Sequence, residues 1–212
     1  MMLTGRHDGP RVAAAILAGG LARRFSGANK AALHVGRESI LDRQLALLRQ
    51  IAEPVFIVSS RADVLPDGAS RGAAVIADAR PGTGPLGGIY TAITSSDRDR
   101  TLVVACDMPF LTLPVLRLLT RDTAADVVVP RSPRGLEPLC AAWSTACAEP
   151  IRRRIERGEL KAAHVMEDLR VEEIGPEELA ACDPHGLLFV NVNTPHDYER
   201  AQGLIRTARG SE

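Results

Sequence analysis

The chain has 212 residues, of which 45% are hydrophobic, so it can bury one good core and has the size of a single domain. Lysine plus arginine and aspartate plus glutamate both number 26, which gives no overall bias towards nucleic acid or an anionic membrane. The four cysteines form no Cys-x-x-Cys pair, and no apolar run is as long as a membrane span. We therefore expect a soluble, cytoplasmic protein with reduced thiols, whose residues 1–10 form a flexible tail without an export signal.

Short runs of Val, Ile, Leu and Ala recur along the first part of the chain. Continuous apolar runs of this length are typical of strands that are buried on both faces of a parallel sheet. The sequence predicts such strands at 12–17, 54–59, 73–77, 101–106 and 126–130.

Two helix-capping patterns lie outside these strands. Ser39 precedes leucines and isoleucines at helical spacing, with Asp42 three residues later, and Thr194 with Asp197 repeats the pattern. We expect one helix to begin after Ser39 and a second to run from Pro195 to about residue 206.

The second half of the chain is less regular. We expect a turn at 131–135, a strand at 139–143, a charged helix at 151–156 and a strand near 187–190. The alternation of strands and helices predicts an α/β fold, a three-layer, mostly parallel, Rossmann-like sheet in one domain over 11–212.

The first predicted strand ends in the sequence ILAGGLARRFSGANK. Gly19 and Gly20 let the backbone approach a ligand and point its N–H groups at phosphate oxygens, and Arg23, Arg24 and Lys30 supply positive charge. This pattern favours a nucleotide triphosphate, although neither a dinucleotide fingerprint nor a P-loop is present. The alternative is a tight turn followed by a solvated basic face.

Two aspartates follow predicted strands. Asp107, in VVACDMPFL, comes at a strand end, where a single carboxylate with substrate phosphates is enough to hold Mg²⁺; alternatively it caps the next turn. Asp78, in IADARPGTGPLGGI, precedes a Gly/Pro-rich segment, which we expect to form a loop that folds over a ligand. That segment could also be a plain flexible connection.

Together these motifs resemble those of the molybdenum cofactor guanylyltransferases, within the larger sugar-nucleotidyltransferase-like group. The resemblance rests on the blocks LAGG with the following basic residues, GPLGG, CDMPFL and NVNTPHD, and it covers the chain after the tail. It implies a nucleotidyltransferase-type fold, with a nucleotide-binding half over about 11–130 and an acceptor-binding half over about 131–212.

The resemblance also implies roles for single residues. Leu17, Ala18 and Gly19 would contact the guanine nucleotide through their backbone, and Asn191 and Asn193 would lie near the metal and the pterin acceptor. Mg²⁺ would be held by Asp107. Catalysis is assigned to Lys30, Arg24 and Asp107. Nucleotide binding is assigned to Leu17, Ala18, Gly19, Gly20, Lys30, Ser59, Asp78 and Asp107.

The reaction that follows is attack of the terminal phosphate of molybdenum-loaded molybdopterin on the α-phosphorus of GTP. Ser59 stands near the place where many family members have an asparagine, and His196 stands where glutamate is common. The implied partners are GTP, molybdopterin, molybdopterin-loading proteins and molybdoenzyme chaperones. Two alternatives stay open: a CTP-dependent nucleotidyltransferase acting on a pterin or on a sugar or polyol phosphate, and a protein that binds pterin or nucleotide without turnover.

Overall fold

The protein is represented by a computed structural model, which describes residues 12–18, 33–60 and 70–209. The predicted tail at 1–10 lies outside these ranges. The strands are β1 (Val12–Leu17), β2 (His34–Val35), β3 (Glu38–Ser39), β4 (Val55–Ser59), β5 (Ala74–Ala77), β6 (Arg100–Ala105), β7 (Val127–Ser132), β8 (Gly135–Leu136), β9 (Cys140–Ser144) and β10 (Val171–Ile174). The helices are α1 (Ile40–Leu48), α2 (Gly84–Thr94), α3 (Leu113–Leu119), α4 (Ala148–Glu156), α5 (Pro176–Cys182) and α6 (Pro195–Arg209), with 3₁₀ segments η3 (Thr145–Cys147) and η4 (Ala162–Asp168).

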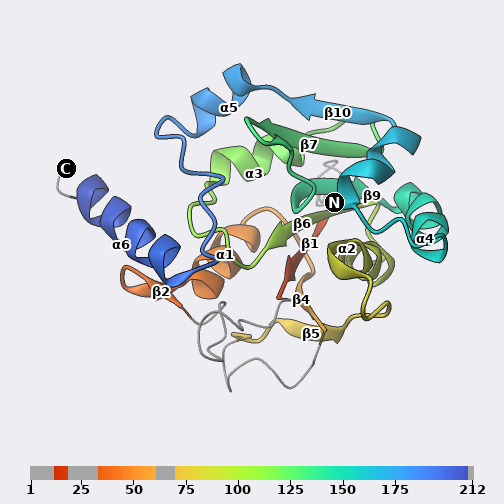
Figure 1. Cartoon of the computed structure of the whole chain (residues 1–212), viewed down its shortest axis with the longest axis horizontal. Helices are drawn as coiled ribbons and strands as arrows, with labels where there is room; N and C mark the ends of the chain where they lie inside the picture. The colour runs from red at the N-terminus through yellow and green to blue at the C-terminus, as the bar shows by residue number, and fades with distance from the viewer. Residues whose placement is uncertain (1–11, 19–32, 61–69, 210–212) are drawn as a thin grey trace, which may run out of the picture.

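One large sheet runs through the molecule in the order β10-β7-β9-β6-β1-β4-β5, with β8 paired to β7 (Figure 1). The neighbours β6, β1, β4 and β5 are all parallel, and β10 is parallel to β7. Strand β9 lies between β6 and β7 and is antiparallel to both. The sheet is therefore mixed but mostly parallel, as the sequence predicts.

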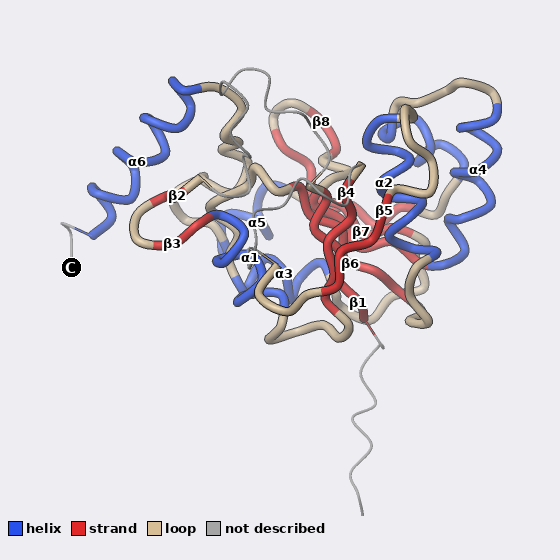
Figure 2. The backbone as a smooth tube through the Cα atoms, turned by 90° about the horizontal axis from the view of Figure 1, so that it is seen from below, coloured by secondary structure: helices blue, strands red, loops and turns tan. Residues whose placement is uncertain are grey.

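Helices cover both faces of this sheet (Figure 2). On one face Leu45 of α1 and Leu116 of α3 are packed against β1 and β6, and on the other Leu86 of α2 and Ile151 of α4 are packed against the opposite sides of the same strands. Burying a side chain of this size contributes about 1.5–3 kcal/mol. The predicted three-layer α/β arrangement is confirmed. None of the helices in the described ranges has the length and apolar character needed to cross a membrane.

Both predicted helix starts are confirmed. The Ser39 hydroxyl oxygen accepts the amide of Asp42 at 3.0 Å. At α6 the Thr194 hydroxyl oxygen accepts the amide of Asp197 at 3.1 Å, and the Asp197 carboxylate in return accepts the amide of Thr194 at 2.8 Å. Such reciprocal bonds satisfy amides that the first helical turn leaves without partners.

The predicted strand at 187–190 is wrong, because this apolar segment forms a turn. The carboxylate of Asp183 accepts the amides of Leu187 at 3.0 Å and Leu188 at 2.8 Å, and the amide of Val190 donates to the carbonyl of Leu187 at 2.9 Å. These local bonds take up the backbone groups that strand pairing would need.

The loop expected over the GPLGG sequence is also corrected, since α2 begins inside it. Gly87 lies within the helix, and a Cβ atom there would be 2.1 Å from the Thr83 hydroxyl oxygen and 2.7 Å from the carbonyl oxygen of Arg80. A Cβ on Gly88 would be 3.1 Å from a methyl group of Leu17. These glycines therefore allow close packing of a helix; they do not make a loop flexible.

Candidate functional site

The carboxyl ends of β6, β1, β4 and β5 lie side by side at one edge of the sheet. The amide of Cys106 donates to the carbonyl of Leu17 at 3.2 Å, and the amide of Ala18 donates to the carbonyl of Val58 at 2.8 Å. Ligands of open α/β sheets bind at this kind of edge. This edge is therefore the expected position of a ligand site.

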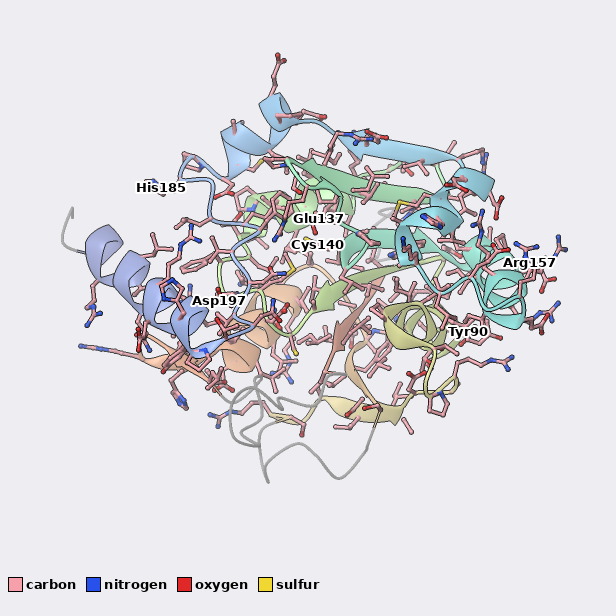
Figure 3. The ribbon with its side chains drawn as sticks, viewed as in Figure 1. Tyr90, Glu137, Cys140, Arg157, His185 and Asp197 are labelled. Carbon is pink, nitrogen blue, oxygen red and sulfur yellow. The ribbon has the colours of Figure 1, made fainter. Side chains whose placement is uncertain are left out.

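A cavity of about 400 Å³ lies at this edge, against the ends of β1 and β6. It receives residues from both halves of the chain, and Figure 3 shows one of them, Glu137, near the centre of the molecule. Its lining is made up of Leu17, Pro85, Ala105, Cys106, Asp107, Met108, Glu137, Pro138, Leu139, Asn191 and Asn193. The structure thus brings together four of the predicted site residues, namely Leu17, Asp107, Asn191 and Asn193.

The backbone joins the two polar blocks in this cavity directly. The amide of Val192 donates to the carbonyl of Asp107 at 2.9 Å, which fixes Asn191 and Asn193 on either side of that bond. The side-chain oxygen Oδ1 of Asn191 is buried and accepts no hydrogen bond from the residues that the structure describes. A buried amide oxygen in that state is costly, and a bound donor or cation would satisfy it.

Glu137 is a cavity residue that the sequence prediction missed. Its Oε1 accepts the Ser132 hydroxyl at 2.7 Å and a guanidinium N–H of Arg134 at 3.3 Å, so the β7–β8 turn holds the carboxylate in place. A glutamate directly before Pro138, after a predicted turn, was the available signal. By itself that signal does not separate a site residue from a surface one.

A second cavity of about 350 Å³ adjoins the first, and the two share Asn191 and Asn193. Its lining is Ser132, Pro133, Arg134, Gly186, Phe189, Val190, Asn191, Asn193, Asp197 and Arg200. The Asp197 carboxylate, labelled at the start of α6 in Figure 3, is engaged by the helix cap, and its bond from the Thr194 hydroxyl lowers the pKa of Asp197. The cavity thus combines two arginines, two amides and an apolar wall.

Asp78 is placed differently from Asp107. Its Oδ1 accepts the amide of Arg80 and the hydroxyl of Thr91, both at 2.9 Å, and its own amide donates to the carbonyl of Ser59. Asp78 and Ser59 lie at the same sheet edge but are not among the residues that line the cavity, and Ser59 is only 2% exposed.

Arg24 and Lys30, together with Gly19 and Gly20, lie outside the described residues. The amide of Ala18 is already bonded to β4, so a backbone contact from Ala18 to a ligand would use its carbonyl oxygen. That oxygen can accept a hydrogen bond from a base or a ribose but cannot donate to a phosphate.

Two of the four cysteines are buried thiols with a raised pKa. All four are in the described ranges, and no disulfide joins them. Burial raises the pKa of the Cys140 thiol to about 12 and that of the Cys147 thiol to about 11, which keeps both in the weakly nucleophilic protonated form.

The sequence matches a known protein family over most of its length. The model of the family described as MobA-like NTP transferase domain matches residues 14–173. A protein from Desulfosudis oleivorans named molybdenum cofactor guanylyltransferase is 34% identical over 92% of this chain and 96% of its own.

The fold also matches solved structures. The molybdopterin-guanine dinucleotide biosynthesis protein A of Archaeoglobus fulgidus superimposes with a TM-score of 0.78 and 27% identity, over 92% of this chain and 98% of its own. The 2-C-methyl-D-erythritol 4-phosphate cytidylyltransferase of Thermus thermophilus superimposes with a TM-score of 0.64 and 18% identity, over 91% and 98%, and this likeness shows the fold alone.

Proposed function

Because the chain belongs to the family of MobA-like NTP transferase domains, we propose that it is a molybdenum cofactor guanylyltransferase. It transfers GMP from GTP to the terminal phosphate of molybdenum-loaded molybdopterin and releases pyrophosphate. The product is the guanine dinucleotide form of the cofactor, and proteins that load molybdopterin and chaperones of molybdoenzymes are its proposed protein partners.

The observation that carries the proposal is the cavity at the ends of β1 and β6. It joins Asp107, from the expected nucleotide-binding half, to Asn191 and Asn193, from the expected acceptor-binding half. A transferase of this kind must hold two anionic substrates in contact at one point. A cavity to which both halves contribute, with a second cavity opening from the same asparagines, has that arrangement.

The donor atoms in the cavity fit Mg²⁺. Asp107 supplies a carboxylate, and Asn191 supplies a buried amide oxygen that lacks a donor among the described residues. Mg²⁺ prefers oxygen ligands and is commonly held by one or two protein carboxylates plus substrate phosphates. Within the described ranges no three His, Cys, Asp or Glu side chains gather as a metal cluster, and a site of this kind does not require one. When bound, the ion would neutralise charge on the phosphates.

The chemistry is a displacement at phosphorus. An oxygen of the acceptor phosphate forms a bond to the α-phosphorus of GTP, and the bond from that phosphorus to the bridging oxygen of the β-phosphate breaks, so pyrophosphate leaves with the electron pair. The attacking oxygen is already anionic, so no general base is needed. Asp107 would hold the cation, and Lys30 and Arg24 would neutralise the charge that builds up on the leaving group.

GTP would bind at the carboxyl edge of the sheet. The backbone of Leu17, Ala18, Gly19 and Gly20 contacts GTP, with Ala18 acting through its carbonyl oxygen because its amide is bonded within the sheet. Asp78 contacts the nucleotide through Oδ2, since Oδ1 is bound by the amide of Arg80 and by the hydroxyl of Thr91 in α2. Ser59 supports this contact by binding the amide of Asp78 with its carbonyl.

The molybdopterin acceptor would bind in the second cavity. Arg134 and Arg200 would receive negative charge of the molybdopterin, and Phe189 would give its ring system an apolar wall. Asn191 and Asn193 would contact the acceptor where the two cavities meet.

Replacing Arg200 with glutamine should therefore raise the KM for molybdopterin about tenfold. This is the effect of losing one charge-assisted bond, and the KM for GTP should stay unchanged. The exposed Arg206→Gln on the same helix is the control, and equal KM values in the two variants would contradict this placement.

The test of the reaction is pyrophosphate release by the purified protein with molybdenum-loaded molybdopterin and Mg²⁺, in parallel with GTP, CTP, ATP and UTP. Release with GTP alone is the expected result. Release with CTP alone would keep the reaction type and overturn the choice of base. Tight binding of GTP without release from any nucleotide would show a binding protein and would overturn the proposal.

A further inference from the structure

A buried glutamine lies behind the turn that carries Asp107. Gln44, on α1, is 1% exposed, and its side-chain nitrogen donates to the carbonyl of Ala105 at 2.8 Å and to the carbonyl of Met108 at 3.0 Å. These two carbonyls stand on either side of the pair Cys106-Asp107. One amide group therefore spans the turn from the end of β6 to the residue after Asp107.

The position of Gln44 in α1 is one that would suit an apolar residue. Ile40, Leu41, Leu45 and Leu48 of the same helix are fully buried against the core, and Gln44 shares their helical spacing. Its Oε1 is also buried and accepts no hydrogen bond from the described residues. Burying an amide oxygen without a donor costs stability, so packing alone does not account for a glutamine here.

The turn that Gln44 spans is bonded from other elements as well. The amide of Cys106 donates to the carbonyl of Leu17 in β1, and the carbonyl of Asp107 accepts the amide of Val192. With the two bonds from Gln44, the backbone on both sides of Asp107 is fixed. The bonds from β1 and from Val192 each fix one backbone atom of the turn. Gln44 binds both of its ends and so sets the distance between them.

We propose that Gln44 is a positioning residue, which fixes the place of the Asp107 carboxylate by holding the carbonyls of Ala105 and Met108. This inference rests on the proposed function, since it gives Asp107 the role of cation ligand. In phosphoryl transfer the catalyst acts by position and charge, and a misplacement of about 1 Å can cost about 100-fold in rate. Gln44 touches neither substrate nor cation and acts only through the backbone of the turn.

The test compares two methionine variants of the same helix. Gln44→Met keeps an unbranched side chain of similar length and removes both donors, and Leu45→Met changes a neighbouring buried residue that makes no bond to the turn. Gln44→Met should raise the Mg²⁺ concentration for half-maximal pyrophosphate release about tenfold and lower kcat about 10- to 100-fold, with the KM for molybdopterin unchanged. Leu45→Met should leave all three values near those of the natural protein. Thermal unfolding of both variants checks that each is folded at the assay temperature.

A second measurement separates this inference from the proposed function. Mn²⁺ binding, measured by its electron paramagnetic resonance signal with GTP present, needs no turnover, and we expect about tenfold weaker binding in Gln44→Met than in Leu45→Met. If the natural protein releases no pyrophosphate, the proposed function fails, and the Mn²⁺ titration still decides the role of Gln44. Equal Mn²⁺ affinities in the two variants, or no Mn²⁺ binding by the natural protein, would overturn the role of Gln44.

Discussion

Asp107 and Asp78 both follow strands that end at the same edge of the sheet, yet their surroundings differ. At Asp107 the neighbouring elements hold the backbone, and the residue lines the cavity. At Asp78 they hold the carboxylate itself, through the amide of Arg80 and the hydroxyl of Thr91. Two aspartates at neighbouring strand ends can therefore differ in which part of the residue the surrounding elements bind.

The largest expected effect is that of Asp107→Asn. The change removes the negative charge and keeps the shape and the backbone bond to Val192, so kcat for pyrophosphate release should fall about 1000-fold while thermal unfolding changes little. The exposed Asp122→Asn, away from the cavity, is the control. An Asp107→Asn enzyme with kcat within a few-fold of the control would remove Asp107 from the site.

Asp78→Asn is the matched change at the other strand end. The new amide oxygen can still accept the bonds from Arg80 and Thr91, so we expect the loss of one charged contact to GTP, about tenfold in kcat/KM and mainly in KM. Steady-state kinetics with varied GTP measures the difference. Equal losses of kcat in Asp78→Asn and Asp107→Asn would contradict the contrast between the two strand ends.

Gly87→Ala tests the packing behind Asp78. Its Cβ atom would be 2.7 Å from the carbonyl oxygen of Arg80, in the loop that binds the Asp78 carboxylate, so the loop or α2 must move. We expect a loss of about 1–3 kcal/mol in the free energy of unfolding by urea. At Gly203, in α6, a new Cβ would lie within 4 Å of no other described residue beyond its own stretch of helix, so Gly203→Ala should gain up to about 1 kcal/mol. A neutral Gly87→Ala would show that the loop is not tightly packed on α2.

The smallest effect is expected at Asp197, whose carboxylate serves a helix cap. Bonds from Thr194 and from the amide of Asn193 lower the pKa of Asp197 in the folded protein. A lowered carboxyl pKa contributes stability above the unfolded pKa of about 3.9, and this contribution is lost as the pH falls through the folded pKa.

Asp197→Ala should therefore lower the free energy of unfolding by roughly 1 kcal/mol at neutral pH and by progressively less below about pH 4. Urea unfolding at a series of pH values measures this difference, and the exposed Glu199→Ala, also in α6, is the control. A constant difference down to the lowest pH would show that the ionised form of Asp197 does not matter.

The regular part of the fold follows from local patterns in the sequence. Strand β1 is apolar throughout, and β6 is apolar from Leu102 to Ala105, because both faces of these strands are buried, and this made them easy to predict. Strand β10, with the sequence VEEI, has only two apolar residues and pairs at the edge of the sheet. It therefore has no apolar run in the sequence that would predict it. Gly87 and Gly88 indicated a loop, although in α2 they allow close packing that only the tertiary structure reveals.

The site was predictable only in part. Asp107 is marked by the strand before it, but nothing local shows that Asn191 and Asn193 reach the same cavity, and they were expected there only from the family resemblance. Gln44 did have a local signal, because it is a polar residue at an apolar position of an amphipathic helix. The carbonyls that Gln44 binds, however, lie 61 and 64 residues away in the sequence. Patterns of a few residues cannot contain such pairings.

The bond between the amide of Val192 and the carbonyl of Asp107 also bears on the order in which the protein is completed during synthesis. The strands that hold Asp107 leave the ribosome long before residues 191–193, so a nascent chain can form its central sheet while the cavity still lacks one wall. The wall of the cavity that Asn191 and Asn193 form is added only after residue 193 has emerged.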